Sequence, residues 1–327
     1  MTYSVGGLIQ ASDFNTFQTS LNTIWSTGST DSGWGQTAIS AVSTGGTVAA
    51  TNWASLLNTL DTARTRTGSV FSPPAPPVAG TVISIIANIA TSISTVTTNR
   101  GNAIASGTEY GTFTGTTSKT TATGSGQAAW TITFTHTITF GSGDQARYFW
   151  NAGGIVRLKY GKSSTGTDSD PDWNTLAGQV GTINLTGRVN AASQSIAAVT
   201  YTGTTRIGGT GGTQTTLATT TGWYNLTGVA TTIFQLNNAT SPYSGEYIRT
   251  TATATSATVL TLVTTWVSDG SSGAGTTANI SGGTAVTSPA TAIGVATAPT
   301  TLVTYIPPST ASLTNSWGIP SIAASVV

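Results

Sequence analysis

The clearest pattern in the chain is a strict alternation of hydrophobic and polar residues between Trp130 and Phe140. Threonine occupies every second position, and the positions between are apolar or aromatic except for His136. Because successive side chains of a β-strand point to opposite faces, this pattern predicts a half-buried strand. Its inner face is expected to carry Trp130, Ile132, Phe134, His136, Ile138 and Phe140.

Residues 1–72 show a different spacing, in which apolar residues recur every three or four positions and predict two short helices. The first is expected to start at Ser12 or Asp13 and to end at Gly28, and the second to follow Val48 and to stop near Gly68. Each apolar stripe is too short to be stable alone, so the helices should pack on each other or on another subunit. We predict a helical attachment module with a core that contains Phe14, Phe17, Trp25, Trp34, Trp53 and Leu56.

A proline-rich segment from Ser72 to Pro77 is expected to form a stiff extended linker, because proline fixes φ and lacks an amide donor. We place the first domain boundary here and assign residues 73–106 to the linker and a following amphipathic helix. The apolar positions of this helix fit two heptads, and β-branched residues at both core positions favour a coiled coil of three chains. The alternative is an ordinary amphipathic helix packed on the chain's own sheet. The apolar positions are Val82, Ile85, Ile89, Ile93 and Val96.

Residues 107–327 contain short runs of β-prone residues between Gly- and Asn-containing turns, which is typical of an antiparallel β-sandwich. Residues 147–150 and 155–160 are expected to continue a meander, and Pro171 to start a short helical turn. Residues 203–221 are expected to form an exposed loop, or else the connection between two sandwich domains. Further strands are predicted at 182–189, 197–202, 223–227, 231–236, 246–255, 258–267 and 302–306. The predicted fold is mainly β: a small helical N-terminal module, a short helix and an antiparallel, threonine-rich β-sandwich.

The low content of charged residues adds information about assembly and partners to the predicted fold. Charged residues make up 6 % of the 327 residues, against about a quarter in typical globular proteins. Such low charge promotes association and favours an assembled protein. The net charge of +1, with scattered Lys and Arg, argues against nucleic acid or an anionic membrane as a partner. Cysteine is absent, the first ten residues do not resemble a signal peptide, and residues 78–99 are too polar for a transmembrane helix.

Two groups of residues could in principle form a catalytic or metal site, and for each we compare this interpretation with a purely structural one. His136 is the only histidine, and its place on the apolar face of a strand favours a structural role. Asp168, Asp170 and Asp172 alternate like the first ligands of a calcium loop, but the glycine and the bidentate glutamate that such a loop requires are missing. We therefore treat the three aspartates as weak metal candidates and favour a solvated loop.

Glycoside cleavage would need a matched pair of carboxylates in a cleft. Glu109 and Glu246 are the only glutamates, and Glu246 is expected at a strand edge, where it could pair with an arginine. The glycine-rich stretch 208–212 has no lysine and does not fit a phosphate-binding loop. We predict no catalytic residue and no cofactor, and we do not expect an enzyme.

Several motifs carry a resemblance to a known family. In the helical part they are Ile9–Asn15, then Asn22, Ile24, Trp25 and Gly28, then Gly33–Gln36, then Val48–Trp53 with Leu56. In the β-rich part they are Phe149–Gly154 with Arg157, Asp172–Leu176 and Tyr243–Ile248. With these motifs the chain resembles virion structural proteins of tailed phages that infect cyanobacteria and other marine bacteria. The resemblance covers most of the chain, and it implies a place on a particle more than an activity.

We therefore expect a virion protein on the particle surface, most simply a homotrimeric fibre or appendage of the tail or neck. Its expected partners are further copies of itself, other virion proteins and a host surface glycan. Two alternatives stay open. A capsid decoration protein would follow the capsid lattice, and a carbohydrate-binding adhesin would bind host glycans.

Overall fold

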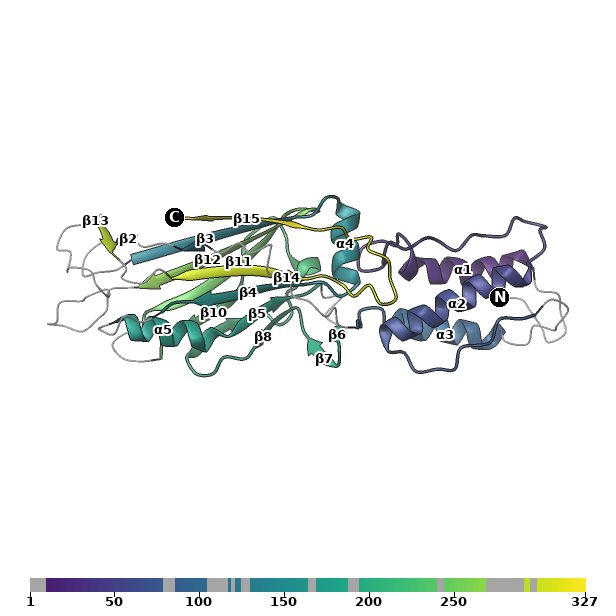
Figure 1. Ribbon diagram of the computed structural model, residues 1–327, viewed down its shortest axis with the longest axis horizontal. Helices are drawn as coiled ribbons and strands as arrows, with labels where there is room; N and C mark the ends of the chain where they lie inside the picture. Colours follow the sequence, from purple (N-terminus) through teal and green to yellow (C-terminus); the bar gives the residue numbers. More distant parts are fainter. Residues whose placement is uncertain are drawn as a thin grey trace.

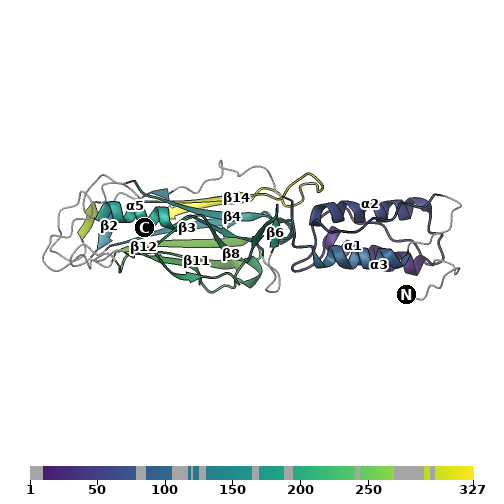
Figure 2. The same ribbon diagram turned by 90° about the horizontal axis from the view of Figure 1, so that it is seen from below.

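The computed structural model describes residues 10–78, 86–104, 117–118, 121–124, 130–163, 169–187, 194–239, 244–268, 291–294 and 299–327. The molecule is elongated, with a bundle of helices at one end and a β-sandwich at the other (Figure 1). A view turned by 90° shows the same end-to-end arrangement (Figure 2). The fold is mainly β with a small helical N-terminal part, as the sequence pattern predicts.

Helix α1 (Ala11–Trp25) forms where the apolar stripe predicts it, but its ends differ from the expected ones. Gln10 occupies the N-cap position, and Asp13 lies one turn inside the helix. The Gln10 N–H donates to the Asp13 carboxylate at 3.2 Å, so Asp13 closes the first turn from within. The helix ends before Ser26, and Gly28 belongs to the loop that follows.

Helix α2 (Ala50–Thr67) ends at Gly68, whose left-handed φ of +63° suits a residue without a side chain. Trp53 packs edge-on against Phe14 of α1, with ring centroids 5.3 Å apart. Phe17 and Leu56 are buried in the same core, while Trp25 is only half-buried at its rim.

Helix α3 (Ile86–Thr98) completes the bundle by packing on α1 and α2. Its apolar residues Ile89, Ile93 and Val96 are 0 %, 4 % and 0 % exposed within the single chain. The expected coiled coil between copies is therefore wrong for these positions, because the stripe is already used inside the chain. The alternative of an ordinary amphipathic helix describes α3, with helices rather than a sheet as its partner. Val82 and Ile85 lie outside the described residues.

The proline-rich residues 73–77 lie in neither helix nor strand, as their composition predicts. They lead from α2 towards α3, and both helices belong to one bundle. This grouping differs from the domain boundary expected at residue 73, since the packing of the bundle continues across the prolines.

In the part of the chain that the structure describes, two antiparallel sheets pack on each other. The five-stranded sheet has the order β1-β14-β4-β5-β8, and the eight-stranded sheet the order β13-β2-β3-β12-β11-β10-β9 with β15 also paired to β3. Strands β6 and β7 form a separate hairpin. The strands are β1 Thr117–Ser118, β2 Thr121–Gly124, β3 Trp130–Thr139, β4 Ile155–Gly161, β5 Thr182–Leu185, β6 Gln194–Ile196, β7 Val199–Tyr201, β8 Thr204–Ile207, β9 Thr213–Leu217, β10 Thr231–Asn237, β11 Tyr247–Ser256, β12 Val259–Ser268, β13 Thr291–Gly294, β14 Thr300–Ile306 and β15 Ser321–Val326.

Strand β3 confirms the alternation that the sequence shows. Ile132, Phe134 and Ile138 are fully buried, as is His136, while the threonines between them are exposed or half-buried. The strand lies between β12 on one side and β15 on the other. Its apolar face therefore becomes part of the core between the two sheets.

The core also contains a chain of hydroxyl groups that crosses between the sheets. The Tyr160 hydroxyl of β4 lies 2.8 Å from the Thr250 hydroxyl of β11, which lies 2.9 Å from that of Thr264 on β12. Burial raises the pKa of Tyr160 above its ordinary value. The Trp173 ring of helix α5 (Ser169–Val180) lies 5.7 Å from that of Trp266 and covers this part of the core. The three hydroxyl groups thus provide hydrogen-bond partners for one another inside the core.

Residues 147–150 form a helix and not the predicted strand. They belong to α4 (Gly143–Asn151), which Ser142 caps by accepting a hydrogen bond from the Gln145 N–H at 3.1 Å. Ser142 and Gln145 are spaced as in a capping box, a signal that the runs of alternating residues around them obscured. Residues 155–160 do form a strand, β4, but it pairs with β14 and β5 and not in a meander with β3.

Three further segments differ from expectation. Residues 223–225 form a 3-10 helix, η1 (Trp223–Asn225), in place of a strand. Residues 203–221 are not a simple loop, because they contain β8 and β9. Strand β15 was not predicted, since its small residues carry little strand signal.

Removing the cap of α4 is expected to lower stability. In a Ser142→Ala variant the Gln145 N–H loses its acceptor, and the free energy of unfolding should fall by about 1 kcal/mol. Urea unfolding monitored by circular dichroism measures the change. Ser55→Ala, at an exposed position of α2, is the matched control and should be neutral. Equal losses in the two variants would contradict the capping role.

Candidate functional site

The aspartates expected as weak metal ligands do not gather into a described site. Asp168 lies outside the described residues, and Asp170 and Asp172 lie on α5, where the backbone is helical and not looped as calcium binding requires. Burial raises the pKa of Asp172, which disfavours its ionised form. Among the described residues, no group of three or more His, Cys, Asp or Glu side chains could hold a metal ion.

His136 and Glu246 are both buried, in agreement with structural roles. His136 is fully buried on β3, on the face that packs into the core. Glu246 lies immediately before β11 and accepts hydrogen bonds from the Asn238 amide at 3.4 Å and the Ser268 hydroxyl at 3.5 Å. Glu246 is thus a buried, hydrogen-bonded group beside the start of a strand, and the hydrogen bonds described for it come from an amide and a hydroxyl. Glu109 lies outside the described residues.

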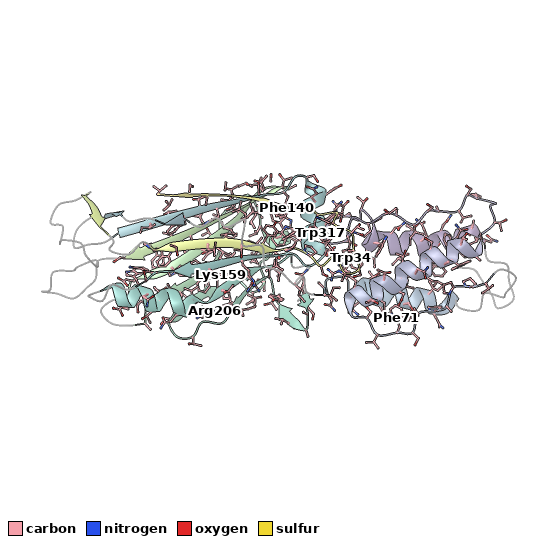
Figure 3. The ribbon with its side chains drawn as sticks, in the orientation of Figure 1. Trp34, Phe71, Phe140, Lys159, Arg206 and Trp317 are labelled. Carbon is pink, nitrogen blue, oxygen red and sulfur yellow. The ribbon has the colours of Figure 1, made fainter. Side chains whose placement is uncertain are left out.

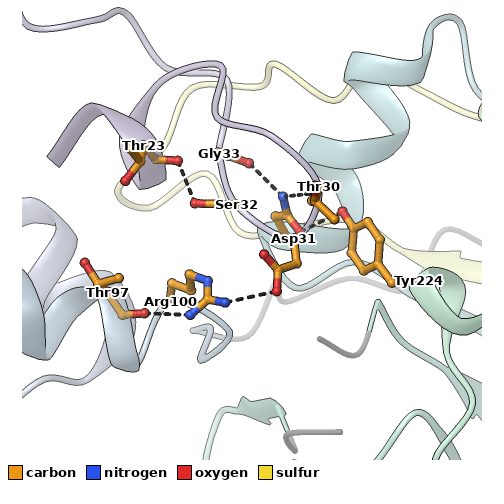
Figure 4. Close-up of polar contacts among 9 residues, drawn as sticks. Thr23, Thr30, Asp31, Ser32, Gly33, Thr97, Arg100 and Tyr224 are labelled. Carbon is orange, nitrogen blue, oxygen red and sulfur yellow. Dashed lines mark hydrogen bonds and ion pairs between the residues drawn. The ribbon is translucent and has the colours of Figure 1, made fainter. Parts of the chain in front are cut away.

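The junction between the helical bundle and the sandwich is the candidate functional site. It is formed by the loop 26–36 after α1, the C-terminal turns of α3 and α4, η1 and the segment 307–320 (Figures 1 and 4). Its residues connect segments that are far apart in the sequence. Because the molecule is elongated, these contacts set the direction in which the sandwich extends from the bundle.

Helix α4 binds the loop 26–36 through backbone carbonyls. The Arg147 guanidinium donates to the Thr27 carbonyl at 2.9 and 3.2 Å, and the Asn151 amide donates to the Gly33 carbonyl at 3.2 Å. The Tyr224 hydroxyl of η1 donates to the side-chain Oδ1 of Asn151 at 2.8 Å, which orients the Asn151 amide towards the loop (Figure 4). Burial is the main reason that the pKa of Tyr224 is raised, so the hydroxyl stays a donor at neutral pH.

An ion pair ties the same loop to the end of α3. The Arg100 guanidinium lies 3.0 Å from the Asp31 carboxylate and also donates to the Thr97 carbonyl at 3.0 Å (Figure 4). The two side chains are 25 % and 16 % exposed, so solvent only partly screens their attraction. The pair therefore links the loop that contacts the sandwich with the third helix of the bundle.

Neutralising this ion pair should weaken the junction in a salt-dependent way. We expect Asp31→Asn to lower the free energy of unfolding by about 0.5–1 kcal/mol at low ionic strength, and by less at high salt. Asp61→Asn is the matched control, because its pair with Arg64 lies within one helix and is more exposed. Thermal unfolding of both variants at two salt concentrations measures the effect. A loss that does not change with salt would exclude the charge as its cause.

Gln36 joins the loop after α1 to the segment 307–320 near the other end of the sequence. Its side-chain oxygen accepts from both the N–H and the hydroxyl of Thr314 at 2.8 Å, and its amide donates back to the Thr314 carbonyl at 3.0 Å. The Ser316 hydroxyl donates to the Trp34 carbonyl at 2.7 Å. Trp34 and Trp317 are both buried here and lie near each other in Figure 3. Trp34, expected in the core of the helical module, thus belongs to the junction as well.

Three positions of the loop, Gly28, Gly33 and Gly35, have a positive φ and no room for a side chain, and Gly33 bears directly on the contact with α4. Gly33 has a φ of +101°, which lies outside the region open to other residues. A side chain there would overlap the Thr27 carbonyl oxygen, the acceptor of Arg147. The absence of a side chain at Gly33 therefore lets the loop fold back closely enough to present its carbonyls to α4.

The bundle also carries a shallow groove between α1 and α3, with a volume of about 440 Å³. Phe17 and Ile93 contribute to its lining, although both are nearly buried. Its rim consists of small hydroxyl residues: Ser20 and Thr23 of α1, and Ser94, Thr97 and Thr98 of α3. Small side chains allow the backbone of another protein to approach closely. The groove is therefore a candidate contact surface on the helical module, the part of the chain that the sequence predicts to be the attachment module.

Comparison with known protein families, curated proteins and solved structures finds no match for this chain. Among the described residues, no helix is both long and apolar enough to span a bilayer. Function is therefore inferred from the architecture and from the resemblance of the sequence motifs.

Proposed function

We propose that this chain is a non-enzymatic structural protein of a tailed-phage particle, in which the helical bundle attaches to the particle and the β-sandwich projects from it. The observation that carries the proposal is the junction, where hydrogen bonds from α4, η1 and residues 314–316 fix an elongated two-part molecule in one orientation. A projecting component needs such a fixed axis. The motif resemblance supports the same class of protein.

The groove between α1 and α3 is the attachment surface in this proposal. Its hydroxyl rim and lack of charge suit a close contact with another virion protein and do not suit nucleic acid. The apolar stripe of α3 is buried in the chain's own bundle, so α3 does not supply the core of a trimer. An appendage of several copies would assemble through other surfaces.

Cryo-electron microscopy of intact particles tests the proposal. We expect density for this chain on the tail or neck, with the helical end towards the particle. Density that repeats over the capsid lattice would favour a decoration protein. Absence of the chain from purified particles would overturn the proposal, and binding of host glycans by the purified full-length chain would favour an adhesin.

A pair of matched variants tests the attachment surface. Ser94→Arg places a long charged side chain on the rim of the groove, whereas Ser55→Arg places one at an exposed position of α2 that does not line it. Both variants should fold, because both positions are exposed. We expect particles to incorporate Ser55→Arg at the wild-type level and Ser94→Arg at least tenfold less. Equal incorporation would exclude the groove.

A further inference from the structure

Strand β15 lies at the upper side of the sandwich in Figure 1 and, among the described residues, pairs only with β3. The two strands are antiparallel and in unbroken register from Ser321 to Val326. The pairing extends to Val327, whose N–H and C=O both bond to Thr133 at 2.9 Å. This doubly bonded pair fixes which residues of β15 direct their backbone groups towards β3.

In an antiparallel ladder, residues that exchange hydrogen bonds with the partner alternate with residues that direct them away. Counting back from Val327, residues 325, 323 and 321 bond to β3. The N–H and C=O groups of Ile322, Ala324 and Val326 therefore point to the opposite, outer side of β15. This side is a row of backbone donors and acceptors at the edge of the sheet.

Strand β15 lacks three of the features by which proteins protect an edge strand, namely charge, proline and a bulge. Residues 321–327 contain no charged side chain and no proline, and the register with β3 has no bulge. Ser321, Ala323, Ala324 and Ser325 are exposed, while Ile322 and Val326 are half-buried against the core. A regular, uncharged edge of small residues is a template for another strand.

The other edge of the same sheet differs. Strand β9 pairs with β10 through a register shift at Gln235 and Leu236, which bends the edge. The Arg206 guanidinium donates to the Gln214 side chain at 3.0 Å and places a positive charge beside β9. Irregularity and charge both disfavour strand addition at β9. On the side of β3 where β15 pairs, the strands β2 and β13 continue the sheet beyond the end of β15, and β1 of the other sheet also lies against β15. Of the two strands β9 and β15, β15 therefore offers the more regular and less charged edge for pairing.

We propose that β15 pairs antiparallel with β15 of a second copy of this chain, about a twofold axis at Ala324. In this register Ala324 opposes Ala324 of the other copy, and Ile322 opposes Val326, so all three outward residues of each strand exchange hydrogen bonds. The half-buried Ile322 and Val326 gain apolar cross-strand neighbours. No like charges meet, and the eight-stranded sheet continues across the axis. The proposal depends on this edge alone and not on a role in a particle.

Proline at position 324 separates pairing from folding. The Ala324 N–H points outward, so Ala324→Pro removes donors from the dimer contact without removing a bond to β3. We expect sedimentation velocity of the full chain to show a concentration-dependent dimer, and Ala324→Pro to weaken it at least tenfold while the melting temperature stays close to that of wild type. A wild-type chain that is monomeric at all concentrations, or a dimer that Ala324→Pro leaves unchanged, would overturn the proposal.

Crosslinking tests the register, because the chain contains no cysteine of its own. Paired residues in the proposed ladder lie about 5.5 Å apart between Cα atoms, within the range of a disulfide. Ala324→Cys should therefore give a covalent dimer under mild oxidation. Ser321→Cys on the same strand should not, because position 321 is far from its own copy in this register, and neither should Thr215→Cys on β9. Dimers of equal yield from Ser321→Cys or Thr215→Cys would exclude the twofold axis at Ala324.

Discussion

Replacing Trp53 with alanine is expected to lower the free energy of unfolding by about 3–5 kcal/mol. Trp53 is fully buried in the bundle, with its ring 5.3 Å from that of Phe14 and 6.4 Å from that of Phe17. The indole N–H has no hydrogen-bond partner, so the loss comes from packing and from the cavity left behind. Chemical denaturation followed by far-ultraviolet circular dichroism measures it.

Trp25→Ala is the matched control for this prediction. Trp25 is half-buried at the rim of the bundle, where its ring lies 6.2 Å from that of Trp34 and its indole donates to the Thr37 carbonyl. Its truncation removes less buried area, so we expect a loss smaller than half of that for Trp53→Ala. Limited proteolysis should also cut α3 faster in Trp53→Ala, because α3 packs on α2. Equal losses in both variants would place the centre of the bundle core elsewhere.

Replacing Arg66 is expected to raise the free energy of unfolding, whereas replacing Trp53 lowers it. Arg66 is 1 % exposed and donates from Nη2 to the Ala152 carbonyl, but its Nε and Nη1 have no hydrogen-bond partner among the described residues. A buried cation that is incompletely paired costs free energy. We expect Arg66→Met, of similar length and without charge, to raise the free energy of unfolding by about 1–4 kcal/mol. Arg64→Met is the control, since Arg64 pairs with Asp61 near the surface and its replacement should be nearly neutral.

The effect of Arg66 should also depend on pH. Burial lowers the pKa of Arg66 from its ordinary value to about 10. A base whose pKa is lower in the folded state destabilises the fold while it is charged, and that penalty is relieved only as the pH rises above the folded-state pKa. The advantage of Arg66→Met should therefore be constant at neutral pH and shrink above about pH 10. A variant less stable than wild type would mean that the guanidinium is stabilised by a partner such as a bound anion.

The sequence predicted those helices and strands whose pattern of apolar residues can be recognised within the segment itself. The alternation in β3 and the stripe of α1 needed no knowledge of the rest of the chain, and both were found. The stripe of α3 also predicted a helix, but an apolar stripe does not say which surface covers it, and the bundle, not a second chain, does so. The helix α4 was missed because its capping pair, Ser142 and Gln145, was outweighed by aromatic residues that favour strands.

The junction was mostly unpredictable for a different reason. Its contacts use backbone carbonyls of Thr27, Gly33 and Trp34 as acceptors, and a carbonyl has no sequence signature. The motifs Gly33–Gln36 and Phe149–Gly154, which contain Gln36 and Asn151, stood out beforehand as parts of a family resemblance. Trp34 was assigned to the core of the helical module, and no residue was assigned to a junction. The glycines on either side of Trp34, in a loop after a helix, were the available signal, because glycine marks a close backbone approach.

The contact between Gln36 and Thr314 spans 278 positions of the chain. During synthesis the bundle can form from local contacts as soon as its three helices have emerged, whereas the junction must wait until nearly all of the sandwich has been made. We therefore expect a chain truncated before Thr314 to hold the bundle on a loosely attached remainder. Only chains in which residues 314–316 have been made and folded would then present the sandwich to a partner in one fixed direction.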